Sequence, residues 1–513
     1  MSIRVRFAPS PTGPLHMGGV RTALYNYLFA RNRDGVFILR IEDTDQNRFV
    51  QGAEEYIMEA LDWCGIRVDE GVREGGPSGP YRQSERKEIY RQYAQQLIDN
   101  GRAYYAFDTG GEIEKRRREA GGIFAYDQNT RMEMRNSLSL SEEEVKKMLV
   151  SGVPYVIRFK MPADEEIIMQ DIIRGEVRVN SNTLDDKVLY KSDGMPTYHL
   201  AHVVDDHLME ISHVIRGEEW LPSLPLHYML YKAFGWSGSM PRFAHLPLIL
   251  KPTGSGKLSK RDGDKMGFPV FPIDWKNSET GEVYPGYREA GYFPEAFVNI
   301  LALLGWNDQT DREIYSMDEL IKAFSLERVG KAGSRFDPDK ARWFNHQYLI
   351  KKSDREISKE WVKILEAKSH GSFRVPDPGT LEKIVGLVKE RVDFVPGLWD
   401  QAWFFFEAPQ VYDEKTVRKR WKEETPGILK EIMEEIRGIK AEKEDPEVYE
   451  KVIKDMIGKH QWSLGGVMNA LRLCLVGKPM GPGVFDIMAV LGKKETISRI
   501  EAAINTIKTE PRI

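Results

Sequence analysis

Residues 7–19 constrain the fold of this chain most, because they join a short strand to a glycine-lined helix start. Residues 3–7 alternate apolar and polar side chains, which indicates a strand, and the prolines and glycines that follow cannot continue it. A stretch with helix-forming residues then runs over 20–30. At such a junction the backbone N–H groups of the first helical turn face the ligand, and Gly18 and Gly19 carry no Cβ that would block it. The segment predicts an anion site; the alternative is that the glycines only make a turn.

A second segment, residues 257–263, is cationic. Lys257, Lys260 and Arg261 surround the hydroxyl of Ser259, and the glycine- and serine-rich residues 253–256 precede them. Lysines are compact cations on long stems, which suits the β- and γ-phosphates of a nucleoside triphosphate. The alternative for this segment alone is a solvated surface loop, as most lysine-rich runs are.

Together, the two segments resemble the paired signatures of class I aminoacyl-tRNA synthetases. The first reads P-x-G-x-x-H-x-G-G over 11–19, and the second reads K-L-S-K over 257–260. Nucleotidyltransferases share this fold, so the class resemblance alone does not select a substrate.

Further blocks are similar to those of the bacterial glutamyl-tRNA synthetases and follow in the family order. They are residues 4–13, 40–45 with Arg48, 83–86, 191–200, 214–220, 303–306, 336–340, 342–345 and 481–488. The stretches 105–150 and 350–460 match the family only loosely.

The resemblance implies ATP-dependent attachment of L-glutamate to tRNA(Glu). Glutamyl-adenylate forms first with release of pyrophosphate, and the glutamyl group then passes to the tRNA 3′ end. ATP and Mg²⁺ are the implied cofactors, and the family default is a monomer with no obligate protein partner. The alternative left open is a non-discriminating enzyme that also glutamylates tRNA(Gln).

The reaction needs positioned groups and neutralised charge rather than a nucleophilic side chain. By resemblance, His16, Lys257 and Lys260 are catalytic. The expected ATP-binding residues are Pro11, Gly13, His16, Gly18, Gly19, Glu219, Lys257, Ser259 and Lys260. The expected glutamate-binding residues are Arg6, Ala8, Ser10, Glu42, Tyr198, His202 and Arg216.

The chemistry of the glutamate set is consistent with an acidic substrate. Arg216 can pair in a bidentate manner with the side-chain carboxylate, and Glu42 can hold the α-ammonium group. Two buried arginines without a carboxylate would be costly, which disfavours the neutral amino acid glutamine as the ligand.

Two positions depart from the family pattern. His202 stands where some members carry asparagine, which leaves its contact with the substrate α-carboxylate open. Zinc-bearing members carry Cys-x-Cys where this chain has Ala106-Phe107-Asp108. Structural zinc favours thiolate-rich ligand sets, so we expect no zinc and no other protein-held metal.

The alternation of strand and helix patterns in the first third predicts an α/β fold with a doubly wound, parallel, Rossmann-type sheet. We expect an acceptor-stem-binding domain inserted into the catalytic domain and an all-α anticodon-binding region after it. The expected domains are 1–102 (first catalytic half), 103–188 (insertion), 189–250 (second catalytic half), 251–330 (lysine loop and stem contact) and 331–513 (helical region).

Two runs in these domains have competing interpretations. The basic and acidic run 114–119 either contacts RNA or is a salt-bridged helix face. The aromatic run 403–406 either stacks unpaired bases or belongs to the helical core, and the core interpretation is favoured.

Composition limits the protein class without naming it. The formal net charge is −4, so no global field attracts nucleic acid, and RNA binding requires local patches. Cys64 and Cys474 are too few for a disulfide framework, which fits a reducing cytosol. No run approaches the roughly 18 apolar residues of a membrane span, and the early strand leaves no room for a leader. We expect a cytoplasmic protein without membrane association.

Two other function classes compete with this interpretation. One is another enzyme, either a nucleotidyltransferase or the anticodon-independent paralogue that glutamylates a modified base. The long helical C-terminal region argues against both. The other is a catalytically inactive RNA-binding relative, and the intact residues 257–260 argue against it.

Overall fold

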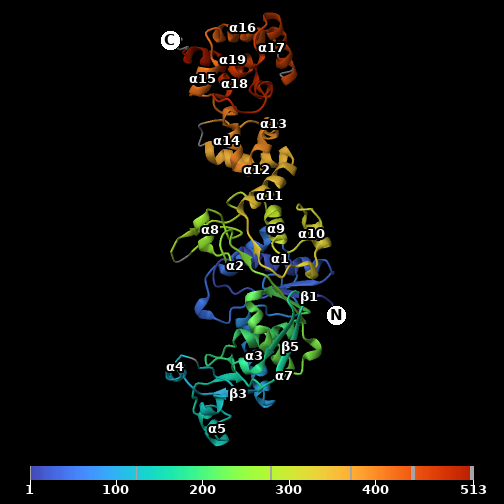
Figure 1. The fold of residues 1–513 in the computed structure, drawn as a ribbon, viewed down its shortest axis with the longest axis vertical. Helices are drawn as coiled ribbons and strands as arrows, with labels where there is room; N and C mark the ends of the chain where they lie inside the picture. Colours follow the sequence, from blue (N-terminus) through green and yellow to red (C-terminus); the bar gives the residue numbers. More distant parts are fainter. Residues whose placement is uncertain (1, 123, 278–279, 370–372, 441–444, 509–513) are drawn as a thin grey trace. The chain divides into compact units, whose positions relative to one another are not determined.

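The computed structural model describes residues 2–122, 124–277, 280–369, 373–440 and 445–508. The chain divides into two compact units, Met1–Ala341 and Arg342–Ile513 (Figure 1). The first unit holds the sheets, and the described elements of the second are helical. Within the described residues, no helix is both long enough and apolar enough to cross a bilayer.

The first unit begins with the predicted strand and helix. Strand β1 (Arg4–Phe7) pairs in parallel with β2 (Val36–Leu39), and α1 (Met17–Arg31) connects them. Helix α1 is buried along most of its length because it packs on β1, β2 and β8 and also contacts α9 (Pro294–Leu303) and α10 (Met317–Ala323). Helices α2 (Ala53–Trp63) and α3 (Lys87–Asp99) follow where the sequence predicts helices.

A four-stranded sheet continues the catalytic fold. Its order is β6 (Gly175–Asn180), β5 (Glu166–Asp171), β9 (Arg242–Leu246) and β8 (His213–Gly217). The pairs β8–β9 and β5–β9 are parallel, as a doubly wound sheet requires, whereas β5–β6 is an antiparallel hairpin. The loop before β8 is joined to β1, because the backbone N–H of Ser212 donates to the carbonyl of Arg4 at 2.9 Å.

The hairpin β5–β6 lies in the segment 103–188, which the sequence suggested to be an insertion. In the structure this hairpin extends the sheet of β8 and β9 instead of standing apart from it. The remaining strands of the segment, β3 (Ala103–Ala106) and β4 (Val156–Phe159), form a separate antiparallel sheet with β7 (Val188–Tyr190). The insertion therefore contributes to two sheets.

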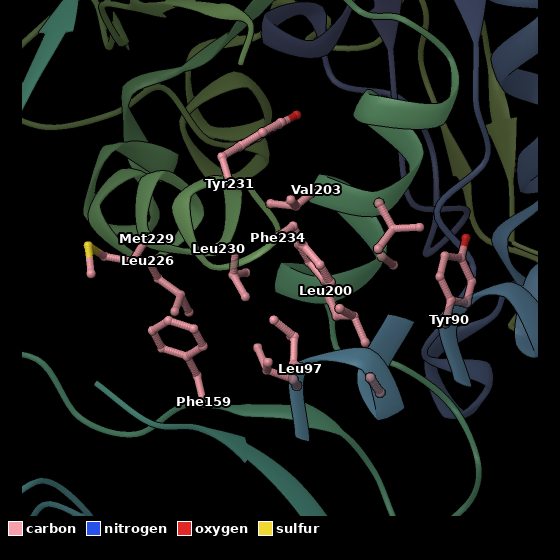
Figure 2. Close-up of a cluster of buried hydrophobic side chains, with 14 of the residues drawn as sticks. Tyr90, Leu97, Phe159, Leu200, Val203, Leu226, Met229, Leu230, Tyr231 and Phe234 are labelled. Carbon is pink, nitrogen blue, oxygen red and sulfur yellow. The ribbon is translucent and has the colours of Figure 1, made fainter. Parts of the chain in front are cut away.

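A buried apolar cluster joins this second sheet to helices of the first unit (Figure 2). It includes Leu97 of α3, Phe159 of β4, Leu200 of α6 (Tyr198–Leu208) and Leu230 of α7 (Leu224–Ala233), each at most 1% exposed. Truncating one such leucine to alanine typically costs about 2–5 kcal/mol of stability. The cluster thus fixes α6, which carries several predicted site residues.

The basic and acidic run lies on α4 (Gly110–Glu119), where the arginines are exposed. Thr109 and Glu112 form a capping box at the start of the helix, and Arg117 pairs with Glu114 at 2.9 Å. The run is therefore an exposed, salt-bridged helix face, and its contact with RNA stays a prediction. Helix α5 (Glu142–Val150) is likewise exposed and starts with a capping box.

The lysine loop is followed by short elements: α8 (Lys260–Met266), β11 (Trp275–Lys276) and β12 (Val283–Tyr284). Strand β13 (Ser334–Arg335) pairs in parallel with β10 (Ile249–Leu250). A strand pair thus extends into residues 331–513, which the sequence predicted to be helical throughout. Two residues are too short to give a strand signal, because alternation needs at least four.

The second unit is built from packed helices. Helix α11 (Pro338–Lys351) crosses the division, and the others are α12 (Asp354–Ser369), α13 (Pro378–Val388), α14 (Leu398–Ala402), α15 (Glu414–Arg420), α16 (Thr425–Gly438), α17 (Pro446–His460), α18 (Leu464–Val476) and α19 (Val484–Thr506). The aromatic run places Phe404 and Phe405 at 2% and 9% exposure, which confirms the core interpretation for these two. Helix α19 is kinked at Gly492, whose φ of 76° is not helical.

Candidate functional site

A cleft of about 860 Å³ opens at the ends of β1 and β8 in the first unit. Segments far apart in the sequence line it: the strand-to-helix junction, α6, the residues after β8 and the lysine loop. The predicted site residues that line it are Arg6, Ala8, Ser10, Gly13, His16, Gly18, Gly19, Glu42, Tyr198, His202, Arg216, Glu219, Lys257 and Lys260. The fold therefore brings the two signature segments and the predicted amino-acid pocket together.

Two predicted residues lie outside this lining. Pro11 lines a smaller cavity that shares Ser10 and Glu42 with the cleft. Ser259 instead starts α8, where its hydroxyl donates to the carboxylate of Asp262 at 2.5 Å. Ser259 thus stabilises the start of α8 within the lysine loop instead of lining the cleft.

At the strand-to-helix junction, His16 lines the cleft and has one buried ring nitrogen without a described partner. His16 is the N-cap of α1, and its Nδ1 accepts from the backbone N–H of Gly18 at 3.1 Å. Burial and the nearby Lys257 lower the pKa of His16 to about 4, so the ring is neutral at pH 7 and carries its proton on Nε2. Among the described residues Nε2 has no hydrogen-bond partner.

The glycines of the junction serve different purposes. A Cβ on Gly19 would lie 2.5 Å from Cδ1 of Leu15, so close packing requires glycine there. Gly13 has a φ of 139°, which a residue with a side chain rarely adopts. A Cβ on Gly18 would make only ordinary van der Waals contacts. Packing therefore does not require glycine at this position, which leaves the close approach of a ligand as the reason for it.

Both lysines of the loop are held by groups on the cleft wall. The Lys257 ammonium pairs with Glu219 at 2.7 Å, and the Lys260 ammonium lies 3.1 Å from the centroid of the Tyr284 ring. Burial would raise the pKa of Glu219, but the hydrogen bond and charge of Lys257, a backbone hydrogen bond and the charge of Arg21 together lower it. Sequence analysis missed Tyr284, because a single tyrosine 24 residues beyond the lysine gives no spacing signal.

Arg6 and Glu42, which line the cleft, belong to a buried network with Arg40 and Asp206, which do not line it. Arg6 pairs with Asp206 at 3.1 Å, and Arg40 pairs with the same carboxylate at 2.8 Å. Arg40 also reaches Glu42 at 3.0 Å. Burial would raise the pKa of Asp206, but Arg6, His202 and Arg40 together hold it well below its usual range. Asp206 thus remains ionised and neutralises its arginines.

This network corrects part of the argument made from the sequence. Of the two arginines expected to lack a carboxylate, Arg6 already has Asp206, which lies on α6 about 200 residues away in sequence. Asp206 and Arg40 were both missed as site residues. The only available signal was the spacing of Asp206 four residues after His202 on one helix face.

His202 is part of the same network. Its Nε2 lies 3.0 Å from Asp206, and its ring stacks on that of His227 at a centroid distance of 4.7 Å. Burial would raise the pKa of Glu42, but His202 and Arg40 outweigh it and lower the pKa. Glu42 is therefore an anion that is already partly compensated.

Arg216 differs from the other arginines of the pocket. It is 5% exposed and donates to the Tyr198 hydroxyl at 2.6 Å and to His245 Nε2 at 3.0 Å. It forms no salt bridge with any residue that the structure describes. Burial lowers the pKa of Arg216, but a guanidinium stays protonated at neutral pH. Arg216 is thus a buried cation that is in direct contact with no carboxylate of the described residues.

The described residues offer no ready metal cage. No group of three or more histidine, cysteine, aspartate or glutamate side chains is arranged to hold a metal ion within them. Asp108, at the position of a family zinc ligand, accepts from the Tyr126 hydroxyl and the Arg135 backbone N–H, both at 3.0 Å. The absence of zinc stays a prediction, and no protein residues are assigned to Mg²⁺.

Comparison with known proteins gives consistent matches over the whole chain. Residues 2–343 match the catalytic domain of class I tRNA synthetases (E and Q), and residues 356–504 match an anticodon binding domain. The glutamate–tRNA ligase of Porphyromonas gingivalis is 58% identical over 509 residues, covering 98% of this chain and 99% of the relative. That of Bacteroides fragilis is 58% identical over 510 residues, 99% of each chain.

A solved structure is similar at the same level. The crystal structure of a glutamate tRNA ligase from Elizabethkingia meningosepticum, in complex with its amino acid, superposes with a TM-score of 0.95. It is 54% identical and covers 99% of this chain and 100% of its own.

Proposed function

The chain belongs to the class I glutamate–tRNA ligases, and from this premise we propose how its cleft attaches L-glutamate to tRNA(Glu). In the first step, an α-carboxylate oxygen of glutamate attacks the α-phosphorus of ATP and the bond to pyrophosphate breaks. In the second, a hydroxyl of the tRNA 3′ end attacks the glutamyl carbonyl and AMP leaves. Both steps require in-line positioning and charge stabilisation more than a protein nucleophile.

The junction and the lysine loop supply the ATP side of the cleft. Lys257 and Lys260 leave Glu219 and the Tyr284 ring to neutralise the β- and γ-phosphates as charge builds on the leaving pyrophosphate. The Nε2–H of His16 and the backbone at Gly18 face the phosphates from the other side. We assign Mg²⁺ to the phosphates of ATP themselves, since this ion usually keeps few protein ligands.

The assignment of glutamate as the substrate amino acid rests on Arg216. Its uncompensated charge faces the same cleft as the lysine loop, and a substrate carboxylate would complete it. Glutamine offers no charge to Arg216, so binding it leaves a buried cation unpaired. Glu42, which also lines the cleft, is the partner for the substrate α-ammonium group.

The inserted segment and the helical unit are assigned to the tRNA. We infer that residues 103–188 contact the acceptor stem and that the helical unit reads the anticodon, which its match to an anticodon binding domain supports. We also infer a cytoplasmic location, because Cys64 and Cys474 are both buried free thiols.

Aminoacylation with separately purified tRNA(Glu) and tRNA(Gln) tests this function. We expect glutamate to be charged to tRNA(Glu), with glutamine rejected by about a hundredfold or more in kcat/KM. Charging of tRNA(Gln) with glutamate at a similar kcat/KM would identify a non-discriminating enzyme. Failure to charge either tRNA with glutamate would refute the assignment.

A further inference from the structure

A buried relay of three side chains lies behind Arg216. Asp171 ends β5, His245 lies on β9, and Arg216 lies directly opposite His245 in the parallel register of β8 and β9. The Asp171 carboxylate accepts from His245 Nδ1 at 2.7 Å, and His245 Nε2 accepts from Arg216 Nε at 3.0 Å. The three residues are 4%, 0% and 5% exposed. The relay thus connects a strand of the insertion to the substrate pocket.

The relay fixes the tautomer of His245. Asp171 is held as an anion by the backbone N–H groups of Ile173 and Arg174, at 2.9 and 2.8 Å, as well as by the ring. A carboxylate only accepts, so Nδ1 of His245 must carry the proton. Nε2 then presents its lone pair to Arg216. Burial lowers the pKa of His245 despite Asp171, which keeps the ring neutral.

This arrangement orients a guanidinium without neutralising it. Arg6 and Arg40 are oriented by Asp206, which compensates their charge. Arg216 is oriented by the neutral His245 ring, the Tyr198 hydroxyl and the backbone oxygen of Trp220, and its Nη1 also lies 3.4 Å from Nε2 of His202. A carboxylate in place of His245 would pair with Arg216 and compete with the carboxylate of the substrate.

We propose that His245, held by Asp171, is a positioning residue that gives the cleft its preference for an acidic amino acid. It aims Arg216 at the substrate side chain and leaves the charge of Arg216 available to the substrate carboxylate. This inference rests on the proposed function, in which Arg216 binds that carboxylate.

Charge-matched variants of the full-length chain test the proposal. His245→Gln and His245→Glu have nearly the same shape and can both accept from Arg216, but only the second adds a charge. We expect the KM for glutamate, measured in tRNA(Glu) aminoacylation, to rise less than about fivefold in His245→Gln and about a hundredfold in His245→Glu. The KM for ATP should stay unchanged, and the preference for glutamate over glutamine should fall with the charge.

Asp171→Asn tests the tautomer without changing any shape. The asparagine oxygen keeps the backbone N–H groups, which turns its NH₂ toward His245 Nδ1 and forces the ring proton onto Nε2, against Arg216. We expect the KM for glutamate to rise about tenfold. His213→Gln is the matched control. His213 is a buried histidine like His245, but it lies on β8 and its ring packs on that of Phe29, with centroids 4.7 Å apart. It should leave both KM values unchanged.

Equal KM values for glutamate in His245→Gln and His245→Glu would overturn the proposal, because only the second variant places a carboxylate beside Arg216. A parallel rise in the KM for ATP would indicate a packing role and would also overturn it. If His245→Glu does not fold, as judged by its melting temperature, Asp171→Asn decides: a wild-type KM for glutamate in that variant refutes the relay. A wild-type chain that does not charge tRNA(Glu) would instead refute the proposed function.

Discussion

Replacing Lys260 by methionine removes the charge of one loop lysine and keeps most of its length. In the structure the Lys260 ammonium lies 3.1 Å from the centroid of the Tyr284 ring, and it must leave this contact to reach the phosphates. A lost charge contact in the transition state costs about 3 kcal/mol, from which the resting cation–π contact of about 0.5–1 kcal/mol is subtracted. The net cost of about 2–2.5 kcal/mol corresponds to a rate reduced roughly 30- to 70-fold.

Glutamyl-adenylate formation in the presence of tRNA(Glu), followed as pyrophosphate exchange, measures this loss. Lys265→Met is the control, because Lys265 lies on the same helix, α8, is exposed and does not line the cleft. The melting temperature and the affinity for tRNA should be nearly unchanged in both variants. Undiminished exchange in Lys260→Met, or an equal loss in Lys265→Met, would refute the role assigned to the loop.

Three other predictions concern the buried network, the tRNA and the insertion. Asp206→Asn leaves Arg6 and Arg40 without their shared anion and should lower the free energy of unfolding by about 3–5 kcal/mol in urea titrations, whereas the exposed Asp62→Asn should change it by less than about 1 kcal/mol. Because the pKa of Asp206 is depressed, its contribution is present above about pH 4 and is lost as the pH falls further; a wild-type stability profile in Asp206→Asn would contradict this. Pyrophosphate exchange should require tRNA(Glu), and full exchange with glutamate and Mg-ATP alone would contradict the family-based expectation. Elemental analysis of active, chelator-treated enzyme should find no stoichiometric zinc, and one equivalent whose removal unfolds residues 105–150 would show that the insertion was misinterpreted.

The parts of the fold that the sequence predicts are those with local signals. Glycine, proline and apolar alternation locate β1 and α1 to within a few residues, because strand and helix periods are local properties. Pairing between distant segments leaves no such signal. The hairpin β5–β6 therefore reads as part of an insertion, although it pairs with β9 about 70 residues later.

The candidate site divides in the same way. Motif residues such as His16 and Lys257 were found because their neighbours form a recognisable pattern, and the structure places both in one cleft. Tyr284, Asp206 and His245 were missed, since each acts on a motif residue from a distant strand or helix. A histidine on a buried strand is more often a satisfied core residue, and only the hydrogen bonds of His245 to Asp171 and Arg216 distinguish it.

From the proposed site we infer that counter-charge, rather than the number of arginines, decides which substrate this pocket accepts. The sequence offers several arginines to an acidic ligand and cannot show which of them are already compensated. In the folded chain Asp206 forms ion pairs with both Arg6 and Arg40, and Arg40 also pairs with Glu42. These two arginines therefore present little net charge to a ligand. Arg216 keeps its full charge because the strand register sets a neutral imidazole beside it. Since a buried cation gains most from a charged partner, selectivity for a carboxylate over an amide is concentrated at this one guanidinium.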